Sequence, residues 1–368
     1  MAGAAGDLVP EFSLLPVIGG GHDRCIAPRG GTPARTRAHF FRGRNQNTGE
    51  ISYNPKAENS RTNIMGRTAE VYIVDAGDRR KAIRKIFREC ISSKFRGSTV
   101  ALKANYNSAD PYPASTHIDT LRALAIETIN EKCAHLTLGE RSGMDKTKDV
   151  LKRRGVFDLG EELGFDVVVL DELDRSGWKI ISDPDLHWQR GFAIAKLFTD
   201  ADRVIQTCCL KTHRFGGHFT GALKNAVGLV ARRVPGDPYD YMSELHQSPH
   251  QRSMIAEINR FYGNDLIVMD AAEGYLTGGP EKGDLISPGV FLASRDRVAI
   301  DAAAVALLRS YGSTPEVMHG AIFSMDQITR AAELGVGVTS ASAIRLVPLD
   351  QHGVSVAAWI QKRFALEG

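Results

Sequence analysis

The residues best suited to chemistry gather between positions 211 and 225. An apolar segment ends in Lys211-Thr212-His213, and Thr220 and Lys224-Asn225 follow shortly afterwards. We predict a strand that ends in the Lys-Thr-His run and a helix that starts at Thr220, whose hydroxyl would cap free backbone N–H groups. A helix N-terminus and two ammonium groups would together attract a carboxylate or phosphate, and His213 is a candidate for proton transfer because histidine titrates near neutral pH. The alternative is a capped helix with surface lysines and a loop histidine.

Polar residues also follow two other apolar segments. Lys103 and Asn105 come after residues 100–102, and Asp270 comes after residues 266–269. In an open parallel sheet the ligand crevice lies beyond the carboxyl ends of the strands. We therefore predict that Lys103, Asn105, Thr220, Lys224 and Asn225 bind substrate, and that Lys211, His213 and Asp270 are catalytic. Gly279 lies in a glycine-rich loop where bare backbone could approach a ligand. The alternatives are a solvated loop at Lys103 and a tight turn at Gly279.

Three further histidines are candidates for a divalent metal. His246 and His250 are four residues apart, which would place them on one side of a helix, and His218 follows the Lys-Thr-His run. Pro249 lies between His246 and His250 and favours a loop or a helix start instead. The sequence therefore leaves the cofactor unknown, with a divalent metal as one alternative.

The elements that must position these residues alternate between short apolar segments and segments with helical spacing. The expected strands are residues 70–74, 98–102, 133–138, 167–170, 203–210, 265–269, 290–293 and 344–347. The expected helices are residues 78–90, 118–131, 146–153, 157–163, 190–198, 252–262, 299–310 and 321–334. Strands that are apolar on both faces are typical of a parallel sheet covered by helices. We expect an α/β fold, with a mostly parallel sheet and helices on both faces, as one large domain or two closely packed lobes.

Composition limits the class of protein. The chain has 368 residues, with 46 Lys and Arg against 43 Asp and Glu. This small, scattered positive charge argues against nucleic acid as a partner. No apolar run is long enough to cross a membrane and no signal peptide is evident, so we expect a cytoplasmic protein. Residues 1–65 are interrupted by glycine and proline and are predicted to form a poorly ordered extension, with the α/β domain at residues 66–368.

The order of the motifs is more informative than any one of them. The motifs in question are Lys103-Ala104-Asn105, Thr116, Gly139-Glu140, Cys209-Leu210-Lys211-Thr212-His213, Thr220-Gly221-Ala222-Leu223-Lys224-Asn225, Gly228, Asp270-Ala271, Gly279-Pro280, Gly283, Ala293-Ser294-Arg295-Asp296 and Asp301. In this order the chain resembles the DUF362 family over about residues 69–337. The resemblance implies a compact α/β domain, and many members of that family carry or accompany a ferredoxin-like four-iron, four-sulfur module.

The cysteines of this chain do not match such a module. Five cysteines are present and none forms a C-x-x-C pair, so no intrinsic iron–sulfur cluster is expected and a redox role would need an external electron-transfer protein. The leading hypothesis is an enzyme, an oxidoreductase or a proton-transfer catalyst, that binds a small anionic organic molecule. The alternatives are a metal- or iron–sulfur-associated accessory protein and a non-catalytic binding module.

Overall fold

The computed structural model describes residues 68–91, 94–216 and 218–367. The extension predicted for residues 1–65 lies outside these ranges. Among the described residues, no helix is long and apolar enough to cross a membrane.

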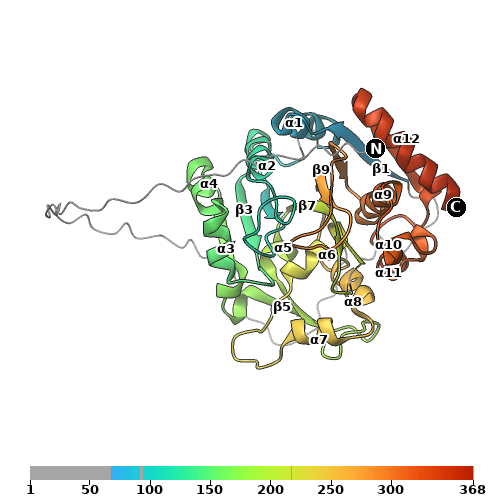
Figure 1. The fold of residues 1–368 in the computed structure, drawn as a ribbon. Coiled ribbons are helices and arrows are strands. Elements are labelled where there is room, and N and C mark those ends of the chain that lie inside the picture. The colour runs from blue at the N-terminus through green and yellow to red at the C-terminus, as the bar shows by residue number, and fades with distance from the viewer. Residues whose placement is uncertain (1–67, 92–93, 217, 368) are drawn as a thin grey trace, which may run out of the picture. The chain divides into compact units, whose positions relative to one another are not determined.

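A large mixed sheet organises the described chain (Figure 1). Its strands follow one another in the order β12 (Ile344–Pro348), β1 (Ala69–Asp75), β11 (Val290–Ser294), β9 (Leu266–Tyr275), β7 (Arg203–His213), β2 (Thr99–Lys103), β3 (His135–Glu140) and β4 (Asp166–Val169). Two short strands extend it, since β8 (His218–Thr220) pairs with β7 and β10 (Leu285–Ile286) pairs with β9. A separate hairpin pairs β5 (Trp178–Ile181) with β6 (Phe192–Ala195).

Most neighbouring strands of the sheet run parallel. The parallel pairs are β12–β1, β9–β7, β7–β2, β2–β3 and β3–β4. Only β11 breaks this pattern among the eight strands of the main order, because it runs antiparallel to both β1 and β9. The predicted mostly parallel sheet is confirmed, and the reversed strand β11 is the exception.

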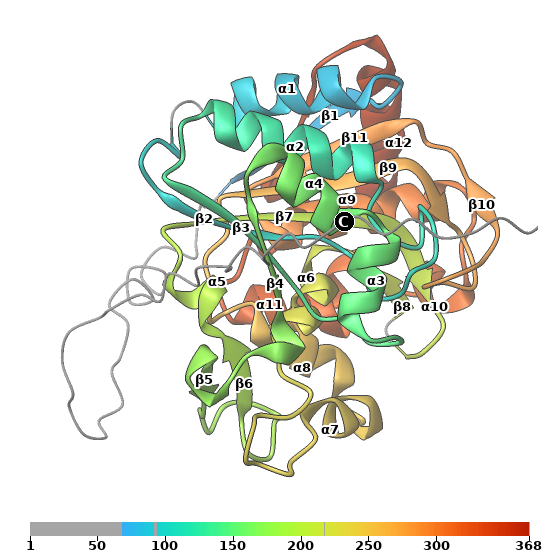
Figure 2. The ribbon, with the colours of Figure 1, turned by 90° about the vertical axis from the view of Figure 1, so that its left-hand side faces the viewer.

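Helices cover both faces of this sheet. The α-helices are α1 (Arg79–Cys90), α2 (Ile118–Asn130), α3 (Thr147–Arg153), α4 (Val156–Leu163), α5 (Lys196–Asp200), α6 (Ala222–Asn225), α7 (Tyr241–Gln247), α8 (Gln251–Ile258), α9 (Arg297–Ser310), α10 (Pro315–Met318), α11 (Asp326–Glu333) and α12 (Gln351–Glu367). Short 3₁₀ turns are η2 (Leu170–Glu172), η3 (Arg175–Gly177), η4 (Ala226–Leu229), η5 (Ile322–Ser324) and η6 (Ala341–Ala343). Figure 2 shows α1 and α2 on one side of the strands and α6, α7 and α8 on the other.

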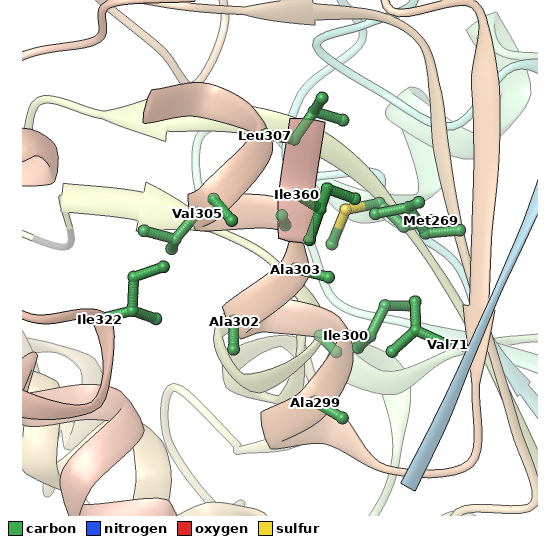
Figure 3. Close-up of a cluster of buried hydrophobic side chains, with 14 of the residues drawn as sticks. Val71, Met269, Ala299, Ile300, Ala302, Ala303, Val305, Leu307, Ile322 and Ile360 are labelled. Atoms are coloured by element: carbon green, nitrogen blue, oxygen red, sulfur yellow. The ribbon is translucent and has the colours of Figure 1, made fainter. Parts of the chain in front are cut away.

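The alternation of side chains along β1 shows how the two faces are filled. Val71 and Ile73 belong to a core cluster that includes Ile300 of α9 and Ile360 of α12, as the close-up in Figure 3 illustrates. Val74 points to the other face, into a cluster shared with α1 and α2. A third cluster fills the space between the β5–β6 hairpin, α7 and α8. Burial of apolar side chains on both faces of the sheet therefore stabilises this strand order, and the strand order determines which strand ends lie together at one edge of the sheet.

Several local predictions differ from the structure, and some elements were not predicted. The helix expected at residues 190–198 is instead strand β6 followed by the short α5, because the apolar run Phe192–Ala195 pairs with β5. Strand β5 and the C-terminal helix α12 were not predicted. The strand expected at residues 203–210 continues to His213, because β8 pairs with its last three residues. This extension carries Lys211 and His213 past the main body of the sheet.

The central helix α9 is buried along nearly its whole length and begins at an acidic cap. The Asp296 carboxylate is buried and accepts hydrogen bonds from the backbone N–H groups of Val298 and Ala299, both at 2.9 Å, and of Val338 at 3.0 Å. It therefore ties the start of α9 to the segment that precedes β12.

Replacing this cap is expected to destabilise the fold. Asp296→Ala leaves three buried N–H groups without their acceptor, and we expect it to lower the free energy of unfolding by about 2–4 kcal/mol. Asp78→Ala is the matched control, because Asp78 caps α1 through the single N–H of Lys81 at an exposed helix start. Urea unfolding of both variants measures the difference, and equal losses would contradict the special role of Asp296.

Candidate functional site

A cleft of about 1770 Å³ opens at the carboxyl ends of β2 and β3 and along the extended end of β7. Seven of the nine residues predicted to bind substrate or to react line it. They are Lys103, Asn105, Lys211, His213, Thr220, Lys224 and Asn225. The topology explains why they meet, because β7, β2 and β3 are parallel neighbours and their carboxyl ends share one edge.

A buried ion pair lies in the wall of the cleft. The Lys103 Nζ atom donates to Glu140 Oε1 at 2.6 Å, and both side chains are almost fully buried. Burial lowers the pKa of Lys103 and raises the pKa of Glu140, while their mutual attraction opposes both shifts. Glu140 also accepts the backbone N–H groups of Tyr106 at 3.2 Å and Arg141 at 2.9 Å, which favours its ionised form. Lys103 is therefore neutralised within the protein.

Lys211 is held differently, by neutral oxygen atoms. Its Nζ donates to Asn105 Oδ1 at 2.9 Å and to the carbonyl of Ala114. Asn105 is itself fixed, because its backbone N–H donates to Thr116 Oγ1 at 2.9 Å. No ion pair joins Lys211 to a carboxylate of the described chain, and burial lowers its pKa.

Arg141 is a second buried cation whose hydrogen bonds go to uncharged groups. Its guanidinium donates to the carbonyls of Val230 at 2.6 Å, Val227 at 2.8 Å and Ser142 at 3.2 Å. Burial lowers the pKa of Arg141, but an arginine stays charged at neutral pH. The guanidinium therefore adds positive charge to this side of the cleft without a direct ion pair, although the carboxylates of Asp171 and Glu140 lie near enough to oppose the lowering of its pKa.

Lys224 is a half-buried cation of the cleft whose ammonium group is not held by a neighbouring oxygen atom of the described chain. Burial, followed by the positive charges of Lys211 and Arg141, lowers its pKa to about 8. A lysine in this position gives up its proton far more readily than one in water.

His213 and Thr220 line the cleft, and each has a buried polar atom without a partner in the described structure. The buried atoms His213 Nδ1 and Thr220 Oγ1 each lack a hydrogen-bond partner. Burial lowers the pKa of His213 strongly, and the nearby charges of Lys224 and Lys211 lower it further. The imidazole is therefore neutral at physiological pH, and one of its ring nitrogens is available to a ligand.

The predicted anion site at a helix N-terminus is wrong, because an internal carboxylate occupies that position. Thr220 lies in β8, and α6 begins after Gly221. Asp301 of α9 accepts the N–H groups of Ala222 at 2.6 Å and Leu223 at 3.0 Å, and burial raises its pKa to about 7. A Cβ on Gly221 would lie 2.2 Å from Asp301 Oδ1, so glycine is needed for this close approach. The lysines, rather than the helix, give the cleft its positive charge.

Two predicted site residues do not line the cleft. Asp270 is fully buried, and its carboxylate accepts hydrogen bonds from Tyr112 Oη at 2.8 Å and Thr120 Oγ1 at 2.6 Å, with Arg79 Nε at 3.4 Å. Gly279 lies in a turn whose carbonyl accepts from Arg214 Nη1 at 3.0 Å. Asp270 thus ties the sheet to α1 and α2 and is separate from the other predicted catalytic residues.

The three histidines considered as metal ligands lie apart from one another, and of the three only His246 is in the lining of the cleft. His218 lies 3.4 Å from Arg252 Nη1, His246 Nδ1 lies 2.6 Å from the Met242 carbonyl, and the His250 ring packs on the ring of His187. In the parts of the chain that the structure describes, no three His, Cys, Asp or Glu side chains group as metal ligands. The structure does not bring these histidines together, and the metal interpretation is not carried forward.

The sequence analysis missed Glu140 and Arg141 as residues of the site. Glu140 is the last residue of strand β3 and Arg141 follows it, at the same sheet edge as Lys103, and this position was the available signal. Gly228 belongs to the same arrangement, since a Cβ there would lie 2.9 Å from Lys103 Nζ and 3.0 Å from Glu140 Oε1.

Comparisons with known proteins give a family but no reaction. A family model described as "Domain of unknown function (DUF362)" matches residues 100–306, which include the seven predicted residues of the cleft. The chain matches no curated protein sequence. A solved structure that it resembles is the lactate racemase apoprotein from Thermoanaerobacterium thermosaccharolyticum, with a TM-score of 0.42 and 13% identity over 78% of this chain and 85% of that chain.

The unpaired charge of Lys224 is expected to cost stability. Its pKa is about 8 in the folded protein against 10.5 as the ordinary value, so the unfolded chain binds more protons between these pH values and the stability contribution of Lys224 rises with pH there. Lys224→Met is therefore expected to raise the free energy of unfolding at pH 7 by about 1–3 kcal/mol, a gain that declines toward zero near pH 10.

Denaturant unfolding of the variant and the natural protein at several pH values measures this gain. The exposed Lys362, on α12, gives the control Lys362→Met, for which no pH-dependent gain is expected. A destabilised Lys224→Met protein at pH 7 would show that an unseen partner compensates the charge.

Proposed function

This chain belongs to the DUF362 family, whose description names no reaction, and we propose from the cleft itself that it is an enzyme that binds a small organic anion and transfers a proton. The observation that carries the proposal is the set of three cations, Lys211, Lys224 and Arg141, that line the cleft without a carboxylate partner among the described residues.

Electrostatics favour an anion as the ligand. Nine Lys or Arg residues and six Asp or Glu residues line the cleft, so its lining is net positive, and Lys211, Lys224 and Arg141 form no direct ion pair with a described carboxylate. A charge that is buried without a partner is costly, and an anionic ligand would remove that cost. A carboxylate or phosphate of the substrate would accept hydrogen bonds from Lys211 and Lys224, with Arg141 adding its charge.

The same cleft contains groups suited to move a proton. His213 is neutral, and its Nδ1 has no partner within the described chain, so it can accept a proton from a bound acid or carbon centre. Positive charge next to the reacting centre would stabilise the developing anion. The role of proton acceptor for His213 follows from this environment.

Removing either lysine is expected to weaken anion binding. We expect inorganic phosphate and malonate to raise the melting temperature of the natural protein, and Lys211→Met and Lys224→Met each to weaken binding by about tenfold or more. Lys362→Met is the control and should bind as the natural protein does. Calorimetric titration measures the affinities, and equal affinity in all four proteins would overturn the anion site.

Proton transfer is tested separately from binding. In D₂O, we expect the protein to accelerate exchange of the methyl protons of pyruvate above the protein-free rate, as seen by proton NMR. His213→Gln should lower this acceleration by about 100-fold while keeping anion affinity, because general base catalysis contributes on that order. Binding of pyruvate with no acceleration of exchange would favour a non-catalytic binding module.

A further inference from the structure

We propose that Lys224 forms an imine with an aldehyde or ketone group of the substrate, which would make the substrate class small carbonyl compounds that also carry a carboxylate or phosphate. The inference rests on the proposed anion site, because the same cleft must hold the charged group while the carbonyl carbon approaches the amine.

Five lysines line the cleft, of which Lys146 and Lys148 are exposed, and the contacts of the other three single out Lys224 as the nucleophile. Lys103 Nζ is held by Glu140, the Ala104 carbonyl and Asn225 Oδ1, and Lys211 Nζ is held by Asn105 Oδ1 and the Ala114 carbonyl. These contacts direct the N–H groups of both ammonium ions to fixed oxygen atoms and favour the protonated form. Lys224 has no such acceptor among the described residues, so its nitrogen is free to lose a proton and attack a ligand.

The neighbours of Lys224 favour the neutral amine that this chemistry needs. Lys211 and Arg141 are positively charged, and together with burial they lower the pKa of Lys224 to about 8. With that value about a quarter of the molecules carry a neutral amine at pH 7.5, against about 0.1% for an unperturbed lysine. A lysine that is desolvated beside other cations is a recognised form of activated nucleophile.

Other residues of the cleft would bind the anionic group and transfer the protons. Once Lys224 has lost its proton to act as the nucleophile, Lys211 and Arg141 would hold the anionic group of the substrate. The neutral His213 lies close enough for the charge of Lys224 to affect its pKa. His213 can therefore accept and return the protons that imine formation moves. Thr220 Oγ1, which is buried without a partner in the described structure, offers a hydrogen bond to the carbonyl oxygen.

The reaction balances without an oxidant or a reductant. The Lys224 nitrogen attacks the carbonyl carbon, and the oxygen takes up the proton that the nitrogen loses, through His213, to give a carbinolamine. The C–O bond then breaks as the oxygen leaves with a second proton as water, and a C=N bond forms. One amine and one carbonyl compound thus give one imine and one water, and addition of water reverses the step.

Reductive trapping tests the proposal directly. The full-length protein is incubated with pyruvate or with dihydroxyacetone phosphate in the presence of sodium cyanoborohydride, and intact-mass and peptide mass spectrometry follow. We expect one reduced adduct per chain, located at Lys224, at a rate at least about tenfold above that of an exposed lysine such as Lys362. Prior saturation with phosphate should slow the labelling.

Variants separate failure of the imine from failure of the anion site. Lys224→Arg keeps the positive charge and is expected to bind phosphate while losing the adduct, and Lys362→Met is expected to label at Lys224 as the natural protein does. An adduct spread evenly over exposed lysines, or no Lys224 adduct in a protein that binds phosphate, overturns the imine and leaves the anion site standing. Absence of both phosphate binding and adduct overturns the proposed function as well.

Discussion

Lys103, Arg141, Lys211 and Lys224 are buried or half-buried in the lining of the cleft, and among these four cations only Lys103 forms an ion pair with a described carboxylate. This imbalance of charge is the constraint on which the arrangement of the site depends. Glu140 can neutralise only Lys103, with which it forms a 2.6 Å contact. Arg141 and Lys211 are held by carbonyl and amide oxygens instead, which satisfy their donors without cancelling their charge. Burying positive charge without an ion-pair partner costs free energy, and the packing of the rest of the fold must offset that cost.

The scaffold supplies that energy through apolar packing and through hydrogen bonds that span long stretches of sequence. Core clusters on both faces fix β2, β3 and β7 as neighbours, so the carboxyl ends of these strands deliver the site residues to one edge. Asp301 reaches from α9 to the start of α6, and the Asn225 amide donates to the Thr207 carbonyl at 3.0 Å. These contacts set the position of the short helix that carries Lys224.

Sequence reasoning located the parallel strands because their apolar runs leave a strong local signal, but it missed the extensions of β7 to His213 and of β9 to Tyr275. It could place Lys103 and Lys211 at one edge, since each directly follows or ends an apolar segment. It could not find the Asp301 cap, because residues 301 and 222 meet only through tertiary packing. Asp270 also follows an apolar run, but its side chain is taken up by Tyr112, Thr120 and Arg79, which no local pattern reveals.

The three buried or half-buried lysines of the cleft show why residue type alone does not define a chemical role. Lys103 is neutralised by a carboxylate, Lys211 is held by two neutral oxygens, and Lys224 has neither kind of partner among the described residues. The environment of Lys103 suits a role in stabilising the fold, and that of Lys211 suits a fixed positive charge that binds a ligand. The environment of Lys224 favours loss of its proton. Because oxygen atoms of the fold hold the ammonium groups of Lys103 and Lys211 but not that of Lys224, the proposed nucleophile is set apart by the distribution of acceptors and not by residue type.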